Sequence, residues 1–325
     1  MANKTFTDKN SKISLFFRAN ASSVSIFIAL LVLCVIMSFA SEYFLTWENM
    51  KNILVYISVG GVMAAGLTVA MLLGGLDVSQ WSILAFCMML MGVLSGLGAP
   101  APVMMAASIA ASIGAGCLNA FIITRMKINP IIATIGTQLI WRSAAFLITN
   151  GEYVYITDPV FKAIGYDSFL FLPIVTWVMI AVYAVLFYVL KYTSFGRKVY
   201  AVGGNPTASY LSGISLDKTR FGAYTISGMV AGIAGILLAS QVSMALPSAG
   251  EGREMDGIAM VILGGVSLSG GKGRIIGTLL GVLILSVLDN GMTLLSVPAY
   301  YQMLAKGIVL IVAVFVDSLR GNKYN

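Results

Sequence analysis

The sequence contains no histidine and few charged residues. It has 20 basic and 13 acidic residues among 325, so charged residues make up 10% of the chain, whereas soluble domains carry about 25%. Hydrophobic residues make up 58%, and the mean hydropathy is +0.92. Too few charges are present to cover a soluble globule of this size. We therefore expect a lipid bilayer to be the main solvent of the chain.

These absences also restrict the chemistry. Without histidine, imidazole is excluded as an acid, a base or a metal ligand. The three cysteines, Cys34, Cys87 and Cys117, all lie inside apolar runs and give no disulfide framework. The apolar runs also hold no acid pair beside a base and no nucleophile with a histidine partner. We predict that the chain has no catalytic residue, no metal site and no cofactor of its own.

The sequence consists largely of long apolar runs. These runs predict an all-α integral membrane protein with about ten transmembrane helices in a single domain over residues 1–325. The interval 256–270 is the weakest of them, because it is short and contains Gly264 and Gly265; it is either a short crossing or a broken half-helix. The ten candidate spans are 22–40, 53–73, 80–97, 102–124, 130–149, 169–190, 221–243, 256–270, 273–290 and 298–316.

The basic residues indicate how the spans are oriented. The net charge of +7 is spread among apolar stretches, which indicates membrane orientation rather than binding of nucleic acid. An N-terminus inside places fifteen Lys and Arg residues on the cytoplasmic side and only Lys51, Lys162 and Arg253 outside. We therefore predict cytoplasmic termini, a cytoplasmic loop at 191–220 and an external loop at 150–168. Lys306 remains inside the last span, where Asp289 is its expected partner.

The glycine-rich segment 264–273 is the most tempting nucleotide motif. A P-loop needs Gly at position 266 and Ser or Thr at position 273, where this sequence has Val266 and Gly273. We therefore expect a tight turn between two membrane segments and no ATP binding by this chain. Glycines also recur four apart, as at Gly228 and Gly232, which favours ordinary close helix packing over a dedicated dimer motif.

A few polar residues at membrane depth are candidates for a substrate path. Asp77 lies between two spans, where capping of the following helix is the alternative role. Thr134, Gln138 and Arg142 are four residues apart in one span, and Thr137 lies beside them. Such a stripe suits passage of a hydroxyl-rich neutral solute, but hydrogen bonding between helices is an equally good interpretation.

The loop at 191–220 contains the signals of a short helix. Asn205 is a suitable N-cap, Pro206 fits the first helical position, and Gly213 can end the helix. Such a helix is too short to be stable alone. Its apolar side chains, with Val202 and Ile214 beside it, would face the cytoplasm and could be buried by a partner protein; the alternative is a surface helix folded back on the bundle. The predicted docking residues are Asn205, Pro206, Ala208, Tyr210, Leu211 and Gly213.

Four separated blocks resemble the permease subunits of bacterial ABC importers for ribose, galactose, arabinose, xylose and allose. The blocks are GGLDVSQWSILAF at 74–86, LNAFIITRMKINPIIATIG at 118–136, FGRKVYAVGGNPTASYLSGI at 195–214 and REMDGIAMVILGGVSLSGGKGRIIGTLLG at 253–281. Trp81 departs from the pattern, because members commonly carry a small residue there, which puts local helix packing at that point in question.

The resemblance implies a transport subunit of the bacterial inner membrane that is not itself an enzyme. It implies that the 205–213 helix docks on a cytoplasmic ATP-binding subunit, which uses the ATP, and that a periplasmic sugar-binding protein delivers a monosaccharide, ribose or a related pentose or hexose. Two permease chains, identical or different, would enclose the path within the lipid. The alternatives are import of a furanosyl or nucleoside-like solute on the same scaffold, and an ion-coupled secondary transporter.

Overall fold

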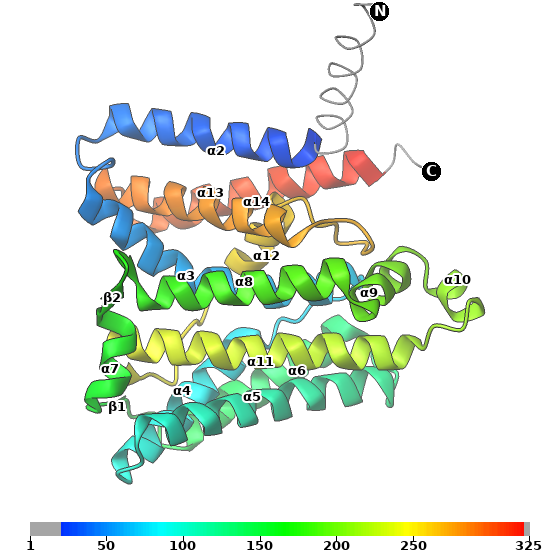
Figure 1. Cartoon of the computed structure of the whole chain (residues 1–325), viewed down its shortest axis with the longest axis horizontal. Helices are drawn as coiled ribbons and strands as arrows, with labels where there is room; N and C mark the ends of the chain where they lie inside the picture. Colours follow the sequence, from blue (N-terminus) through cyan, green and yellow to red (C-terminus); the bar gives the residue numbers. More distant parts are fainter. Residues whose placement is uncertain (1–20, 322–325) are drawn as a thin grey trace, which may run out of the picture.

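The computed structural model describes residues 21–321, which form a bundle of helices (Figure 1). Five helices have the length and hydropathy of membrane spans. The helices are α2 (Ala21–Ala40), α3 (Trp47–Leu72), α4 (Gln80–Gly96), α5 (Ala101–Thr124), α6 (Pro130–Leu147), α7 (Pro159–Tyr166), α8 (Ile174–Tyr192), α9 (Ser194–Gly204), α10 (Pro206–Leu211), α11 (Leu216–Val242), α12 (Glu254–Leu263), α13 (Ile275–Leu294) and α14 (Ala299–Gly321).

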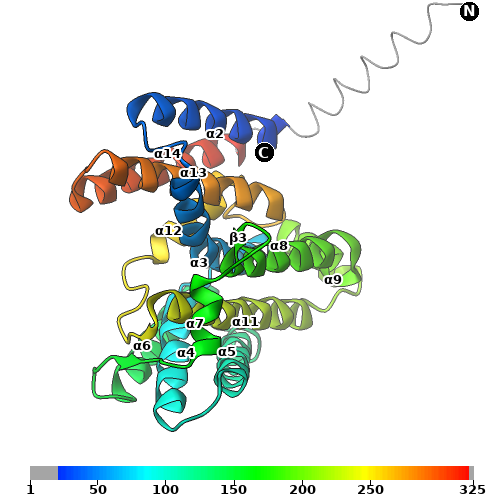
Figure 2. The same cartoon turned by 60° about the vertical axis from the view of Figure 1, so that its left-hand side comes forward.

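Helix α3 lies between two groups of helices. Helices α4, α5, α6 and α11 pack together on one side, and α2, α12, α13 and α14 pack on the other (Figures 1 and 2). Of the most apolar part of α3, 83% is buried inside the protein, compared with 39% for α5 and α8. The core of the protein therefore surrounds α3.

Each of the ten candidate spans contains one described helix. Besides the five long apolar helices α3, α5, α8, α11 and α13, three shorter apolar segments lie at Val24–Ala40, Gln80–Gly96 and Ala299–Phe315. The prediction of a helical, multi-pass membrane protein is confirmed. Ten crossings and the sidedness of the termini stay predictions.

The predicted span 169–190 begins too early. Residues β2 (Ser168–Phe169) and β3 (Leu172–Pro173) form an antiparallel pair, and α8 begins only at Ile174. Leu170 and Phe171 at the turn have φ angles of 47° and 68°, which an α-helix does not allow. A hydrophobic hairpin was thus mistaken for the start of a span.

Helix α12 is only half as long as a membrane span. Its ten residues extend about 15 Å at 1.5 Å per residue, whereas the hydrocarbon core is about 30 Å thick. A turn follows, in which Gly265, Gly270 and Gly271 have positive φ. Of the two interpretations of 256–270, the broken half-helix describes the structure.

The turn 264–274 reaches the end of the bundle that carries α9 and α10. The Gly271 N–H donates to the Leu72 carbonyl (2.8 Å), and the Tyr200 hydroxyl donates to the Gly273 carbonyl (3.1 Å). Burial raises the pKa of Tyr200, against a smaller lowering by Arg274, so its hydroxyl keeps the proton that it donates. The expected tight turn is present at the same end as the 191–220 loop.

Glycines allow α5 and α11 to approach closely. A Cβ on Gly228 would lie 2.6 Å from the Gly116 Cα, and a Cβ on Gly232 would collide with the Ser112 side chain. The glycine pair predicted to serve ordinary helix packing does so within this chain.

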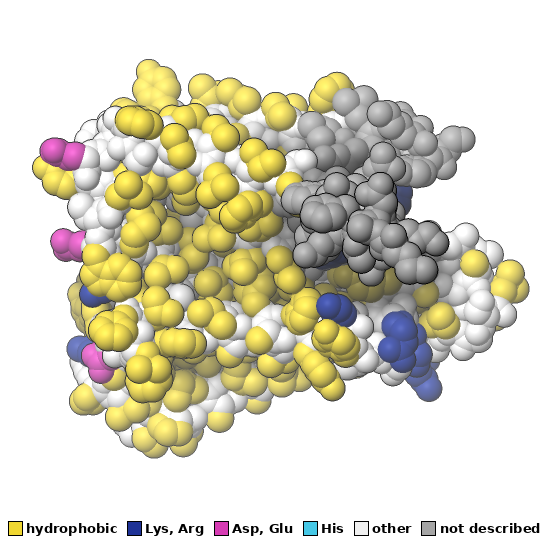
Figure 3. Space-filling model, turned by 45° about the horizontal axis from the view of Figure 1, so that its top comes forward, with side chains coloured by type: hydrophobic (Ala, Val, Ile, Leu, Met, Phe, Trp, Pro, Cys, Tyr) yellow, Lys and Arg dark blue, Asp and Glu magenta, His cyan; other side chains and the backbone are white. Residues whose placement is uncertain are grey.

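The surface matches a bilayer environment. Hydrophobic side chains cover the middle of the face in Figure 3, and the visible acidic side chains gather at one end. Phe39, Leu139 and Leu147 are examples of large apolar side chains that are more than half exposed.

The described chain ends lie at one end of the bundle. The N-terminal end of α2 and the C-terminal end of α14 both lie toward the end of the bundle that carries α9 and α10 (Figure 1). The opposite end carries α7 and the antiparallel pair of β1 (Val154–Tyr155) with β4 (Met244–Ala245). The basic residues predicted for the cytoplasmic termini, Lys4, Lys9, Lys12, Arg18 and Lys323, lie outside the described residues.

Candidate functional site

Two non-helical segments meet inside the bundle. One is the 73–79 connection between α3 and α4, and the other precedes α12. A small cavity lies between the 73–79 connection with the start of α4 and the start of α12, and it is lined by Asp77, Trp81, Glu254 and Gly257 among others. Discontinuous helices place backbone polar groups at membrane depth only where protein or a cavity covers them. This meeting point is therefore the candidate site.

Asp77 connects three helices from the first segment. Its carboxylate is only 3% exposed and accepts hydrogen bonds from the hydroxyls of Ser79 and Ser227, both at 2.6 Å. Asn119 donates to the Ser79 hydroxyl at 2.8 Å. Ser227 belongs to α11 and Asn119 to α5, so the carboxylate joins the start of α4 to both helices.

The capping role considered for Asp77 accounts for part of this geometry. Its Oδ1 also accepts the Ser79 backbone N–H at 3.2 Å, just before α4 begins at Gln80. The Gln80 amide in turn lies 2.7 Å from the Ser227 hydroxyl. Sequence reasoning did not select Ser227, Asn119 or Gln80, although each is a polar residue in or beside an apolar run.

The polar stripe of α6 contacts the 73–79 connection and the start of α12. The Thr134 hydroxyl lies 2.9 Å from the Pro130 carbonyl of its own helix and 3.2 Å from the Leu76 carbonyl, and Gln138 donates to the Glu254 carboxylate at 3.1 Å. Thr137 is buried and donates within its own helix, to the Thr134 carbonyl. Gln138 therefore makes a hydrogen bond between helices, as one of the two interpretations expects, and the role of the stripe in a substrate path stays a prediction.

Arg142 ends the stripe and contacts the segment before α12. Its Nη1 donates to the carbonyls of Pro247 and Ala249, both at 2.8 Å. Its Nη2 is buried and has no hydrogen-bond partner among the described residues. A buried donor without a partner is costly, so this nitrogen is suited to an acceptor such as a solute hydroxyl.

Trp81 has a packing partner that explains its presence. The indole lies against Gly250, where a Cβ would collide with the ring, and Gly250 has a φ of +70°. Gly257 of α12 is also close to the indole nitrogen. The unusual tryptophan is therefore accommodated by glycines of the opposite segment, and it closes one wall of the small cavity.

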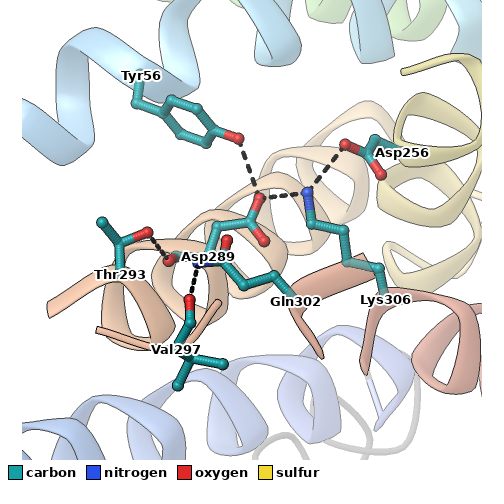
Figure 4. A network of polar contacts seen from close by, with 7 residues as sticks. All are labelled: Tyr56, Asp256, Asp289, Thr293, Val297, Gln302 and Lys306. Atoms are coloured by element: carbon teal, nitrogen blue, oxygen red, sulfur yellow. Dashed lines mark hydrogen bonds and ion pairs between the residues drawn. The ribbon is translucent and has the colours of Figure 1, made fainter. Parts of the chain in front are cut away.

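A network of charged side chains holds α12 from its other side (Figure 4). Lys306 of α14 lies 2.9 Å from Asp289 of α13 and 3.1 Å from Asp256 in the first turn of α12. The Tyr56 hydroxyl donates to Asp289 at 3.0 Å. The predicted pairing of Lys306 with Asp289 is confirmed. Asp256 and Tyr56 were missed.

Helix α12 is therefore tied to both helix groups through its first turn. Glu254 accepts from Gln138 of α6, and Asp256 pairs with Lys306 of α14. Hydroxyl, amide, carboxylate and guanidinium groups suit hydrogen bonding to a neutral polyhydroxylated solute.

The short helix α10 has the predicted caps. The Asn205 side chain accepts the Ala208 N–H at 2.9 Å, Pro206 opens the helix, and Gly213 follows with a φ of +80°. Leu211 is 79% exposed, and Tyr210 and Ala208 are also exposed. Val202 was expected to be exposed beside them, but it belongs to α9 and is fully buried, because it lies on the face of α9 that packs on the bundle.

Helix α10 projects beyond the bundle at the far end (Figure 1). It is therefore not folded back along the spans. A salt bridge of 2.8 Å between Lys127 and Asp217 lies close to its base, beside a pocket that Tyr210 and Gly213 help to line. Its exposed apolar side chains are available to a partner.

The fold and the site together define a multi-pass permease component of a transport system. Residues 49–314 match the family described as branched-chain amino acid transport system / permease component. The chain is 40% identical over 295 residues to the ribose import permease protein RbsC of Escherichia coli K12, covering 90% of this chain and 92% of that protein.

Other relatives agree. The ribose import permease protein RbsC of Haemophilus influenzae is 37% identical over 91% of this chain and 93% of its own. The L-arabinose transport system permease protein AraH of Escherichia coli K12 is 35% identical over 84% of each chain. No solved structure matches. The chain belongs to the ABC transporter permease family that contains RbsC and AraH, and as a permease component it is a transport subunit, not an enzyme.

Proposed function

We propose that this permease imports a monosaccharide across a bacterial inner membrane, with ribose as the first candidate and a related pentose or hexose as the next. The observation that carries the proposal is the similarity to ribose import permeases over nine tenths of the chain. The whole chain acts as one translocation unit, with the 191–220 loop in the cytoplasm and 150–168 outside.

The energy comes from a cytoplasmic ATP-binding subunit. The 264–273 segment lacks the residues of a P-loop and forms a turn against Leu72. Exposed Leu211 and Tyr210 on α10 provide a surface on which that subunit can dock. A periplasmic sugar-binding protein delivers the solute to the opposite end, and a second permease chain completes the conduit.

The path passes the meeting point of the two non-helical segments. Arg142 brings an unpartnered buried nitrogen there, and Gln138 and Glu254 bring an amide and a carboxylate. Asp77, Thr134 and Thr137 hold the backbone of this wall, and Arg142 with Gln138 contacts the sugar. Movement of α12 opens the wall, and it requires release of Glu254 from Gln138 or of Asp256 from Lys306.

Uptake competition tests the substrate. Cells that lack their own ribose permease receive this chain with the ATP-binding and sugar-binding proteins encoded beside it, and uptake of labelled ribose is measured. We expect excess unlabelled ribose to abolish the signal and nucleosides to leave it unchanged. Inhibition by nucleosides and not by pentoses or hexoses would refute the sugar proposal.

The Arg142→Lys variant tests the path. Lysine can reach a carbonyl but has no second nitrogen to offer a solute. Transport should lose about tenfold in kcat/KM, consistent with loss of one hydrogen bond to a charged donor, with normal amounts in the membrane. The control is Lys162→Arg, which lies on α7, away from the proposed path. Unchanged kinetics of Arg142→Lys would show that Arg142 is not part of the path.

A further inference from the structure

A cleft of about 610 Å³ lies at the end of the bundle that carries α9 and α10, apart from the site described above. It is bounded by the last turn of α8, by α9 and by the start of α13. None of the residues assigned to the solute path or to the docking helix lines it. Its position is where apolar spans give way to charged connections.

The cleft is basic. Lys191, Arg197 and Arg274 line it, and no carboxylate is among the described residues that do. Helix α13 begins at this point with no side-chain cap and no acidic residue in its first turn. The positive end of its dipole adds to the three cations. An anionic group is therefore the complementary ligand.

The rest of the cleft is apolar and reaches the surface at Ile276. Phe187, Leu190 and Ile276 line it, and Ile276 is 51% exposed. Tyr188 and Tyr192, both exposed, lie in the same last turns of α8, and tyrosines gather at the headgroup level of membranes. Figure 3 shows basic side chains with hydrophobic ones beside them toward this end of the surface.

We propose that this cleft binds one anionic phospholipid, with the phosphate between Lys191 and Arg197 and an acyl chain along Phe187 and Ile276. An acidic segment of the ATP-binding subunit would pair with Lys191 and Arg197 but would leave the exposed Ile276 without an apolar contact. That subunit also has a different surface, on α10 beyond α9. The lipid fits both halves of the cleft, and the inference does not depend on which solute is transported.

Native mass spectrometry of the purified permease tests the proposal. The protein is titrated with palmitoyl-oleoyl phosphatidylglycerol and, separately, with the matching phosphatidylcholine. We expect one phosphatidylglycerol to bind more tightly than phosphatidylcholine. The double variant Lys191→Gln, Arg197→Gln should weaken it on the order of thirtyfold, since each basic group near a membrane surface strengthens attraction to anionic lipid about fivefold.

Two further variants distinguish binding of a lipid phosphate from binding of inorganic phosphate. Lys198→Gln removes an exposed cation beside Arg197 that does not line the cleft, and it should leave binding unchanged. Ile276→Ser should weaken the binding of phosphatidylglycerol but not that of inorganic phosphate. All variants are first checked for an unchanged elution volume in size-exclusion chromatography.

Four outcomes would overturn the proposal. They are equal binding of phosphatidylcholine, an unchanged double variant, an equal loss in Lys198→Gln, and unchanged binding of phosphatidylglycerol by Ile276→Ser. Loss of the ATP-binding subunit from the double variant in lipid-free detergent, with lipid binding intact, would assign the cleft to that subunit instead.

Discussion

Single buried polar side chains connect the helices of this permease. The Asp77 carboxylate receives two hydroxyl donors from α11 and from the start of α4, with Asn119 of α5 one bond further away. Buried polar groups are stable only when each has a partner. Removing the acceptor therefore affects three helices at once.

We predict that Asp77→Leu destabilises the protein by about 2–5 kcal/mol, because the hydroxyls of Ser79 and Ser227 lose a buried acceptor. Asp77→Asn keeps one acceptor oxygen and a similar shape, so its cost should be about 1–2 kcal/mol. Thermal unfolding in detergent measures both. Melting temperatures of both variants equal to that of the parent protein would show that the carboxylate network is not stabilising.

Lys306 has a comparable position in the other helix group. Its ammonium group pairs with both Asp256 and Asp289 within one partly buried cluster (Figure 4). We predict that Lys306→Met lowers stability by about 3–5 kcal/mol, since two like charges are left facing each other. The triple variant Lys306→Met, Asp256→Asn, Asp289→Asn should recover most of the loss. A triple variant as unstable as the single one would contradict this account.

The sequence predicted some of these residues and not others for a physical reason. Asp77 and the α6 stripe could be selected because polar groups in apolar runs are rare and because a spacing of four places them on one face. Ser227, Asn119 and Glu254 reach the site only through contacts between distant segments. Their positions depend on how the helices pack against one another. The spacing of residues along one helix carries no information about that packing.

At the scale of elements, local chemistry decided which predictions were correct. The caps of α10 were predictable because Asn205, Pro206 and Gly213 act within a few residues of one another. The start of α8 was predicted wrongly because hydropathy does not distinguish the hairpin at Leu170 and Phe171 from a helix. The break after α12 was one of two options, since glycines permit a turn without requiring it.

The docking role of α10 leads to a prediction at this scale. Leu211→Asp should leave the isolated permease folded, because the side chain is already exposed. It should weaken co-purification of the ATP-binding subunit on the order of a hundredfold by placing a charge in an apolar contact. The matched control is Tyr155→Asp, exposed at the opposite end. Full retention of the subunit by Leu211→Asp would make α10 an ordinary surface helix.

At the scale of the whole molecule, the arrangement of the helices agrees with the distribution of the basic residues. The turn with Lys272 and Arg274, the α9–α10 connection and the described ends of α2 and α14 share one end (Figure 1). This grouping is what the positive-inside count predicted from sequence. The helix order explains this grouping, because successive connections fall at alternate ends of the bundle. The alternation is kept even though α12 is only a half-helix.

Cysteine labelling can establish which end faces the cytoplasm. In a background with Cys34, Cys87 and Cys117 replaced, a single cysteine at exposed Thr207 should resist an impermeant maleimide in intact cells, and one at exposed Glu152 should react. Labelling at position 207 without permeabilisation would show that the topology is the inverse of the one predicted.

The central claim is that this chain forms the sugar path and leaves the use of ATP to a partner. The direct measurement is labelled ribose transport into proteoliposomes that contain the permease, its ATP-binding subunit and its sugar-binding protein. We predict uptake that requires ATP and all three proteins, persists when the proton gradient is collapsed, and falls to background with Leu211→Asp. Uptake by the permease without the ATP-binding subunit, or uptake that stops on proton uncoupling while ATP is present, would contradict the account.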